Sequence, residues 1–426
     1  MESVCTALTK CSDLQKVELY FGNNCIDNKG IADLTASLES QTKISTLLLN
    51  FYLNNIGELG AQCLSNCLMK FKQLQNLELN LGYNHIGKIG AQSILSALAH
   101  CTNLSTLSLD LKHNKIFASN LDQQLCLDLT SYENQLSLKL SLEYNSSKQF
   151  YQNQQGELGF AINFINSSII RSLDLGIYSI NDQEAYKLGS ILANCNNLET
   201  LTLNLKDNYL LQAQGAQNLF SALSCSQTLQ SLTLMMQQVK IGNEGLVSLS
   251  NFLSKCHLLS KLNLYFNLDN IGLQSIQSFQ HSLSICSNLS DIVLELAQME
   301  KEGIFMLGNA FGNCENLSKI DINLDYNQIN DEDIEKFSQS LIKCSKLSWL
   351  HLSLIENSFG LKGAQKLYEN LVLCTNLSSL YLKLGRNQHS EGDLDGEQID
   401  FDSLTHIIAS SEHITLYDIR ANQYFY

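Results

Sequence analysis

The stretch "LELNLGYNHIGKIGAQSIL", residues 77–95, carries the pattern that decides the fold. The stretch "LLLNFYLNNIGELGAQCL", residues 47–64, has the same pattern thirty residues earlier, and "LHLSLIENSFGLKGAQKL", residues 350–367, has it again. The shared features are alternating apolar residues, an Asn, an apolar residue followed by Gly, and Gly-Ala-Gln. An internal repeat with a period near thirty residues therefore organises this chain.

Each copy predicts a strand, a loop and a helix in that order. Period-two alternation such as Leu201, Leu203 and Leu205 predicts a short strand with one apolar face. A turn containing Asn and Gly follows, and then apolar residues recur at helical spacing, as at Ile94 and Leu98. One such unit cannot bury both apolar faces, but stacked units can, which predicts a parallel sheet on one side and helices on the other.

A second signature, C-x-x-L-x-x-L-x-L-x-L, precedes many of the predicted strands. Its cysteines are Cys11, Cys101, Cys195, Cys256, Cys286, Cys314, Cys344 and Cys374. At residues 41, 71, 132, 167, 226 and 411 the Cys is replaced by Gln, Phe, Tyr, Ser, Ser and Ser, while the apolar ladder continues, so the chain holds about fourteen copies. Because free Cys behaves as a small apolar residue, the repeated position predicts buried thiols.

The recurring pattern L-x-x-L-x-L-x-L-x-x-N-x-I-G-x-x-G-A-x-x-L resembles the leucine-rich-repeat family, and specifically its ribonuclease-inhibitor-like class. The resemblance covers nearly the whole chain. It implies an α/β solenoid shaped as a horseshoe, with parallel strands on the concave face, helices on the convex face and about fourteen repeats of ~30 residues. It also implies that the concave strand face binds proteins, because this is the family's usual role.

Composition and repeat spacing predict a single solenoid over residues 1–426. Proline is absent, and nothing in the sequence marks a linker between domains. Repeat spacing becomes irregular at about 112–170, an acidic loop insertion is expected at 387–402, and a terminal strand and aromatic tail are expected at 411–426.

Charge and hydropathy exclude several classes of partner. The net charge is -15 and the acidic residues are spread along the chain, which argues against nucleic acid. The apolar runs are too short to cross a membrane, and the first residues, "MESVCTALTKCSDL", lack the pattern of a secretory signal. We therefore expect a cytoplasmic protein whose 14 Cys are thiols.

A nucleotide site is the first alternative, because Gly82, Gly87 and Lys88 match most of a phosphate-binding loop. A working loop needs Ser or Thr after the Lys to hold magnesium, and Ile89 stands there instead. Other repeats keep the glycines at the turn and the helix but not the Lys. The sequence therefore predicts a structural turn and no bound nucleotide.

Metal sites and catalytic cysteines are weakly supported. Cys63 and Cys67 lie one helical turn apart and could form half of a zinc site, but no second pair has suitable spacing. "EGDLDGEQIDFD", residues 391–402, partly matches a calcium loop, yet Gln398 and Asp402 depart from its pattern. We predict no metal, cofactor or catalytic residue and favour a solvated acidic loop at 391–402, with calcium left as the alternative.

The candidate binding residues are those that alternate with the buried ladder and so face away from the core. On the concave face they are Glu18, Tyr20, Glu78, Asn80, Asp110, Asp174, Met235, Tyr265, Glu295, Asp321, His351 and Tyr381. We also expect the C-terminal residues Tyr424, Phe425 and Tyr426 to dock on a partner, because this end of the chain shows no polar cap.

The leading functional hypothesis is a non-catalytic scaffold for protein partners. It would be a subunit of a multi-subunit complex, with a cytoskeletal or ciliary (axonemal) location as a further expectation by analogy. The alternative is a GTPase-activating protein similar to the Ran-directed leucine-rich-repeat family, although the chain has only three Arg and no acidic tail like that family's. A weaker alternative is an inhibitor-type binder of a basic protein, favoured by the acidic concave face.

Overall fold

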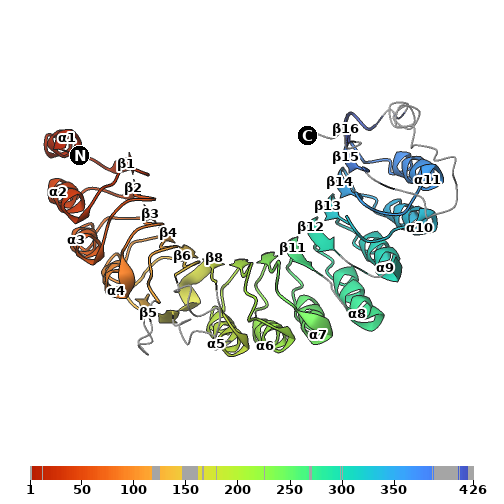
Figure 1. The fold of residues 1–426 in the computed structure, drawn as a ribbon, viewed down its shortest axis with the longest axis horizontal. Coiled ribbons are helices and arrows are strands. Elements are labelled where there is room, and N and C mark those ends of the chain that lie inside the picture. The colour runs from red at the N-terminus through yellow and green to blue at the C-terminus, as the bar shows by residue number, and fades with distance from the viewer. Residues whose placement is uncertain are drawn as a thin grey trace. The chain divides into compact units, whose positions relative to one another are not determined.

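The structure is a computed structural model that describes residues 2–11, 13–117, 125–145, 162–165, 167–178, 180–224, 226–267, 271–297, 299, 301–385, 387, 411 and 413–420. The chain divides into two compact units, Met1–Leu211 and Gln212–Tyr426, and each is described by itself (Figure 1). The expectation of one continuous solenoid therefore stays a prediction.

Strands and helices alternate in the first unit, apart from one irregular stretch. Its strands are β1 Lys16–Tyr20, β2 Thr46–Asn50, β3 Asn76–Asn80, β4 Thr106–Asp110, β5 Leu125–Asp128, β6 Leu136–Ser141, β7 Ile162–Ile165, β8 Ile170–Gly176 and β9 Thr200–Asn204. Its helices are α1 Glu2–Thr9, α2 Asn28–Leu38, α3 Glu58–Leu68, α4 Gly87–Leu98 and α5 Asp182–Ala193, with a short 3₁₀ helix at Ser167–Ile169.

The second unit alternates regularly through most of its length. Its helices are α6 Ala213–Leu223, α7 Gly242–Leu253, α8 Leu273–Ser284, α9 Lys301–Gly312, α10 Asp331–Leu341 and α11 Leu361–Val372. Its strands are β10 Ser231–Met235, β11 Lys261–Asn267, β12 Asp291–Ala297, β13 Lys319–Asn323, β14 Trp349–Ser353, β15 Ser379–Lys383 and β16 Leu416–Arg420.

The main sheet is parallel in both units, and its strands follow the order of the chain. The order is β1-β2-β3-β4-β6-β8-β9 in the first unit and β10 to β16 in sequence in the second. Within each unit the helices lie along one side of these strands (Figure 1). This is an α/β solenoid of leucine-rich repeats, so the predicted fold class is confirmed, whereas the ribonuclease-inhibitor-like class stays a prediction.

The apolar ladder of the sequence is the core of each unit. Register aligns Leu47, Leu77 and Leu107 on neighbouring strands, and all three are 1% exposed. Burial of one such side chain stabilises the fold by about 1.5–3 kcal/mol relative to leaving it exposed. Because successive side chains of a strand point to opposite faces, the residues that alternate with these leucines along each strand face away from this core.

In many repeats, an asparagine in the loop after the strand joins that repeat to the preceding one. Asn84 is 2% exposed, and its amide donates to Phe51 O at 2.8 Å and to Leu81 O at 3.0 Å. Its Oδ1 accepts from Ile56 N at 2.9 Å. Equivalent bonds are made by Asn54, Asn114, Asn145, Asn208, Asn327, Asn357 and Asn387. We call these stacked asparagines the asparagine ladder. It satisfies backbone groups that the loops would otherwise bury without partners.

At the start of some helices, backbone N–H groups donate to a side-chain oxygen of the preceding repeat. Asn28 Oδ1 accepts from Gly57 N at 2.7 Å and from Gly60 N at 3.0 Å, at the start of α3. Asp331 Oδ1 does the same at the start of α11, through Gly360 N and Gly363 N. These oxygens satisfy amides that a helix leaves unpaired at its first turn.

The stretch that the sequence marks as irregular has a different convex side. Strand β5 pairs in parallel with β7 through Leu125 and Ile162, in a sheet separate from the main one. The side-chain amide of Gln92 on α4 makes two bonds to the backbone of Cys126: Oε1 accepts from Cys126 N at 3.2 Å, and Nε2 donates to Cys126 O at 3.4 Å. A short strand thus stands beside α4 where a regular repeat has a helix.

The helices are short. Among the described residues, none is long and apolar enough to cross a membrane.

Candidate functional site

Four neighbouring strands of the second unit place an acid, two aromatic rings and a second acid in one row. The cross-strand register pairs Asp321 with His351, His351 with Tyr381, and Tyr381 with Asp418. Trp349 lies two residues before His351 and therefore faces the same side of β14. We call Asp321, Trp349, His351, Tyr381 and Asp418 the Trp349 site.

The three rings of the Trp349 site contact one another. The centroids of Trp349 and Tyr381 are 5.6 Å apart, with the ring planes tilted by 43°. Trp349 and His351 are 6.2 Å apart, and His351 and Tyr381 are 6.4 Å apart with nearly perpendicular planes. These separations lie in the favourable range for aromatic pairs, so the rings form one cluster.

A hollow of ≈ 320 Å³ lies over this cluster. It is lined by Asp321, Trp349, His351, Tyr381, Leu382, Lys383 and Asp418. His351 Nδ1 lies 2.7 Å from Asp321 Oδ1, and the two side chains are 25% and 32% exposed. The carboxylate therefore orients the imidazole while leaving part of both groups open to a ligand.

A lysine and several acidic groups border the Trp349 site. Lys319 Nζ lies 4.5 Å from the centroid of the Trp349 ring, on its cross-strand neighbour. On β11, burial raises the pKa of Tyr265, and the negative charges of Asp321 on β13 and Glu295 on β12 raise it further. The concave side of these strands thus carries negative charge beside the aromatic cluster.

The structure brings some of the predicted concave residues together in the second unit. Asp321, His351 and Tyr381 share the Trp349 site, as described above. Met235, Tyr265 and Glu295 form a separate row across β10, β11 and β12.

In the first unit, three of the predicted residues are paired with lysines, namely Glu18, Asp174 and Asp110. Glu18 lies 2.6 Å from Lys16 on β1, and Asp174 on β8 lies 3.0 Å from Lys139. Tyr20, at the end of β1, is 64% exposed. Glu18 and Tyr20 lie on β1 and Asp174 lies on β8, and these residues form no ring cluster like the Trp349 site.

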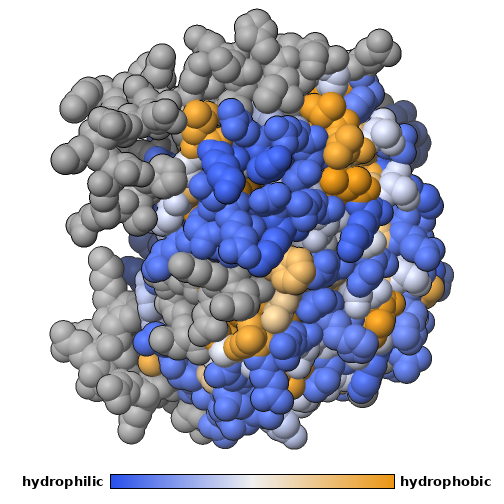
Figure 2. Space-filling view, turned by 90° about the vertical axis from the view of Figure 1, so that its right-hand side faces the viewer, coloured by the Kyte–Doolittle hydropathy of each residue, from blue (hydrophilic) through white to orange (hydrophobic). Residues whose placement is uncertain are grey.

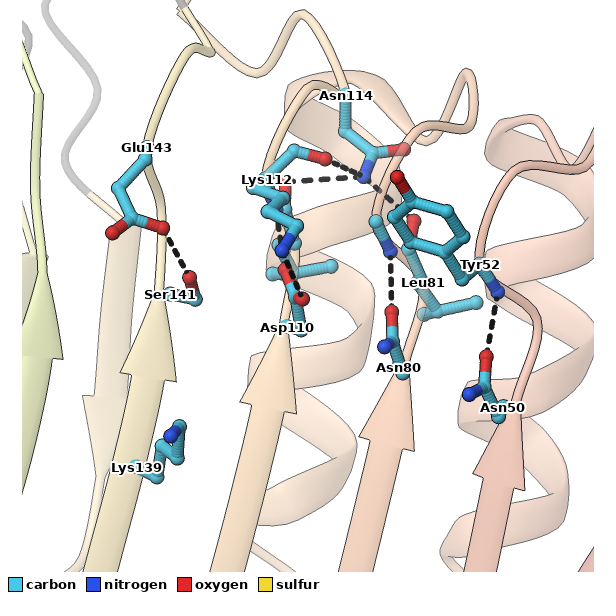
Figure 3. A network of polar contacts seen from close by, with 12 residues as sticks. Asn50, Tyr52, Asn80, Leu81, Asp110, Lys112, Asn114, Lys139, Ser141 and Glu143 are labelled. Atoms are coloured by element: carbon cyan, nitrogen blue, oxygen red, sulfur yellow. Dashed lines mark hydrogen bonds and ion pairs between the residues drawn. The ribbon is translucent and has the colours of Figure 1, made fainter. Parts of the chain in front are cut away.

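Asn80 and Asp110 bond to the backbone at the ends of their strands (Figure 3). Asn80 Oδ1 accepts from Gly82 N, and Asp110 Oδ1 accepts from Lys112 N, both at 3.0 Å. Asp110 also forms an ion pair with Lys112 at 3.3 Å. Both oxygens close a local turn, which is the ordinary role of Asn and Asp after a strand. Glu78, on the same strand as Asn80, faces the concave side and is exposed.

Sequence reasoning missed Trp349, although it is the single Trp of the chain. The candidates were taken from positions that follow an apolar ladder residue, whereas Trp349 stands directly before Leu350, the first ladder leucine of its strand. Strand alternation extended by one step would have found it, because residues i and i+2 share a face. Asp418 lies in the copy that begins at Ser411, but it was not among the candidates.

The first unit carries a stack of aromatic rings that sequence reasoning also missed. Successive centroid separations along Tyr52, Tyr83, His113, Tyr144 and Tyr178 are 5.1, 4.0, 4.6 and 4.5 Å. The rings lie in the loops after the strands, where Figure 3 shows Tyr52 beside the turn residues. Tyr83, His113 and Tyr144 have φ of 54–56°, which a bulky residue adopts only at a cost.

The residues that resemble a phosphate loop serve the fold. Gly87 has φ +61°, a left-handed value that glycine adopts freely. A Cβ on Gly90 would lie 3.0 Å from Ala61 Cβ of the preceding helix, so this position needs glycine for close packing. Lys88 is equivalent to Asn28, which lies two repeats earlier. Asn28 caps the next helix, α3, by accepting from Gly57 N.

The cysteines that were weighed as a zinc half-site differ in environment. Cys67 is 3% exposed, its thiol donates to Thr35 O, and burial raises its pKa to about 12. Cys63 is half-buried. Within the described ranges, no group of three or more His, Cys, Asp or Glu side chains is arranged to hold a metal ion. The acidic loop 391–402 and the tail residues Tyr424, Phe425 and Tyr426 lie outside the described residues.

Figure 2 shows the side of the molecule that lies on the right of Figure 1. The described residues on this side are mostly hydrophilic, and the apolar ones form separate small patches. Patches of this kind are normal on a protein surface and indicate no binding site by themselves. The ring cluster of the Trp349 site is therefore the more specific feature.

No protein-family model matches the chain, and no curated protein matches it. Among solved structures it is similar to internalin C2 from Listeria monocytogenes, with 16% identity and a TM-score of 0.30, over 57% of this chain and 85% of that one. A likeness at this level carries no argument about function, so the assignment of a leucine-rich-repeat solenoid rests on the strands and helices themselves.

Proposed function

We propose that this chain is a non-catalytic scaffold that binds a protein partner through the Trp349 site. The observation that carries the proposal is the contact of Trp349, His351 and Tyr381 around one hollow on the strand face. Trp and Tyr are enriched among the few residues that dominate binding energy at protein interfaces. Elsewhere in the second unit, the strand face offers single aromatic residues such as Tyr265.

The chemistry of the hollow supports binding over catalysis. The pair Asp321 and His351 could orient a general base, but a nucleophile would have to stand next to it. Among the described residues that line the hollow there is no Ser, Thr or Cys. Aromatic residues such as Trp and Tyr are enriched at protein interfaces.

We further propose that the partner belongs to a multi-subunit complex, because a solenoid offers a long surface for several contacts. A cytoskeletal or ciliary location stays a prediction. For the GTPase-activating alternative, the described residues offer no feature that favours it over a scaffold. The concave face of the second unit carries both acids and lysines, so an inhibitor of a basic protein is also not favoured.

The experiment compares three forms of the full chain in affinity purification from the source cells, followed by quantitative mass spectrometry. They are the wild type, the double variant Trp349→Ala/Tyr381→Ala, and the control Tyr186→Ala, which removes a 58% exposed Tyr from the convex helix α5. We expect one or more proteins to fall about tenfold with the double variant and to stay with the control. If every co-purified protein is equally abundant with all three forms, the proposal is wrong.

A further inference from the structure

We propose that the Trp349 site receives an arginine side chain of the partner. This inference rests on the proposed function and names the chemistry that the site recognises. It starts from the row Asp321, His351, Tyr381 and Asp418, in which two aromatic rings lie between two carboxylates. Arg is the side chain that stacks on rings and pairs with carboxylates at the same time.

The rings of the site are suited to a cation. Lys319 already places its ammonium 4.5 Å from the Trp349 centroid, within the ~6 Å range of a cation–π contact. This contact comes from the β13 side of the indole. Tyr381, on the β15 side, presents a second ring to the hollow. A guanidinium entering the hollow can therefore stack on Tyr381 while Lys319 keeps its place.

The carboxylates would orient the guanidinium in the hollow. Asp418 is the cross-strand neighbour of Tyr381, and neighbouring strands are ~4.8 Å apart. A planar group stacked on Tyr381 can thus donate in its own plane to the Asp418 carboxylate, a charge-assisted geometry that an ammonium does not match. Asp321 stands at the other end of the row, where it holds His351.

The positive groups near the hollow lie outside this row. Lys319 stands in the strand position of Trp349, and Lys383 stands at the end of β15, two residues beyond Tyr381. They flank the row on two sides, while the two carboxylates of the row stand at its ends. An ammonium and a guanidinium carry the same charge, but the planar and weakly hydrated guanidinium can stack on Tyr381 and pair with a carboxylate at the same time.

The hollow also fits the size of one side chain. Its volume of ≈ 320 Å³ is at the lower end of known ligand sites, which hold about 300–1,000 Å³. A single extended Arg with part of its backbone can occupy it. A folded element of a partner would have to lie over the strand face and insert this one residue.

The test uses a randomised peptide library displayed on phage, selected on the full chain and counter-selected on Trp349→Ala/Tyr381→Ala. Tyr186→Ala is the control that should retain every selected peptide. We expect the peptides that need the two rings to share an Arg at one position. If they share an apolar or aromatic residue instead, the arginine inference fails and the proposed function stands. If no peptide depends on the rings, the proposed function fails as well.

A second measurement examines the Arg itself. The intrinsic fluorescence of Trp349 reports binding, because it is the single Trp of the chain. We expect replacement of the shared Arg by citrulline, which keeps the shape without the charge, to weaken binding by about tenfold. With Asp418→Asn, the Arg and citrulline peptides should bind within about twofold of each other. Equal affinities of the two peptides for the wild type would overturn the inference, even if the rings are needed.

Discussion

The Lys319 ammonium lies 4.5 Å from the centre of the Trp349 ring, on the adjacent strand. This pair shows that the aromatic cluster of the strand face already holds a cation of the chain itself. The cluster is thus both a local stabilising feature and the candidate anchor for a partner.

The variant Lys319→Gln tests the energetic part of that relationship. Lys319 is exposed, so loss of the cation–π contact should lower the free energy of unfolding by only about 0.5–1 kcal/mol. Urea unfolding followed by Trp349 fluorescence measures the change. Lys29→Gln, on helix α2 of the first unit, is the matched control and should change the free energy by less than about 0.5 kcal/mol. A loss above about 2 kcal/mol for Lys319→Gln would contradict an exposed contact.

The asparagine ladder predicts a large effect at Asn84 and a small one at Asn80. Asn84→Ala removes the bonds to Phe51 O, Leu81 O and Ile56 N. The two carbonyls keep the amides of Asn54 and Asn114, whereas the buried Ile56 N loses its Asn84 acceptor, so we expect the free energy of unfolding to fall by about 1–3 kcal/mol. Asn80→Ala removes one bond in a half-buried turn and should cost about 0.5–1 kcal/mol. Denaturant unfolding of both variants gives the comparison. Equal losses would show that the ladder does not join the repeats as described.

The buried thiols predict that the protein loses stability at alkaline pH. Burial raises the pKa of Cys256, Cys314, Cys344 and Cys374 to about 12, above the ordinary value of 9.0. Their contribution is fully present below about pH 9 and is lost as the pH rises towards 12, by up to ~1.4 kcal/mol per pH unit for each thiol. Denaturant unfolding between about pH 8 and pH 11 measures this slope.

The variant Cys256→Ala is the check on that slope. It should unfold more easily at neutral pH, because it leaves a small cavity, and yet lose stability less steeply above about pH 9. Native-state alkylation with iodoacetamide should label exposed Cys11 and Cys25 well before Cys256. Labelling of Cys256 at the rate of Cys11 would contradict its burial.

The ring stack of the first unit predicts an acid-sensitive contribution from His113. Burial lowers its pKa, Lys112 lowers it further, and Asp110 opposes both. Because the folded-state value is depressed, the contribution is present above the unfolded value of about 6.5 and is lost as the pH falls through the folded value. A pH titration of the His113 ring by NMR measures this pKa, and His113→Phe should keep the stack without that loss. A measured pKa above about 6.5 would contradict the account.

The repeat pattern predicted the strands and helices because period and burial are coupled. Leu77 and Leu107 face the core for the same reason that they alternate in the sequence. The glycines at 87 and 90 were likewise assigned correctly to a turn and to helix packing. The short strand β5 beside α4 could not be predicted, since the repeat signal is weak there and no local pattern specifies a partner.

The candidate site was only partly predictable. Asp321 and His351 were recognised as facing the same side, but their pairing depends on strand register, which follows from the whole set of turns. The stack of Tyr83 and His113 depends on left-handed backbone in two loops, and residue type alone does not reveal this for bulky side chains. Contacts between residues thirty positions apart become visible only once the repeats are aligned in space.

Fluorine NMR on protein labelled with fluorotryptophan tests the central claim most directly, because the chain has one Trp and so gives one resonance. The unlabelled ligand is the partner recovered by affinity purification or a selected peptide. The account predicts that the Trp349 resonance shifts or broadens as the ligand saturates the protein. A resonance that keeps its position and width, while calorimetry shows the ligand bound, would contradict the Trp349 site as the anchor.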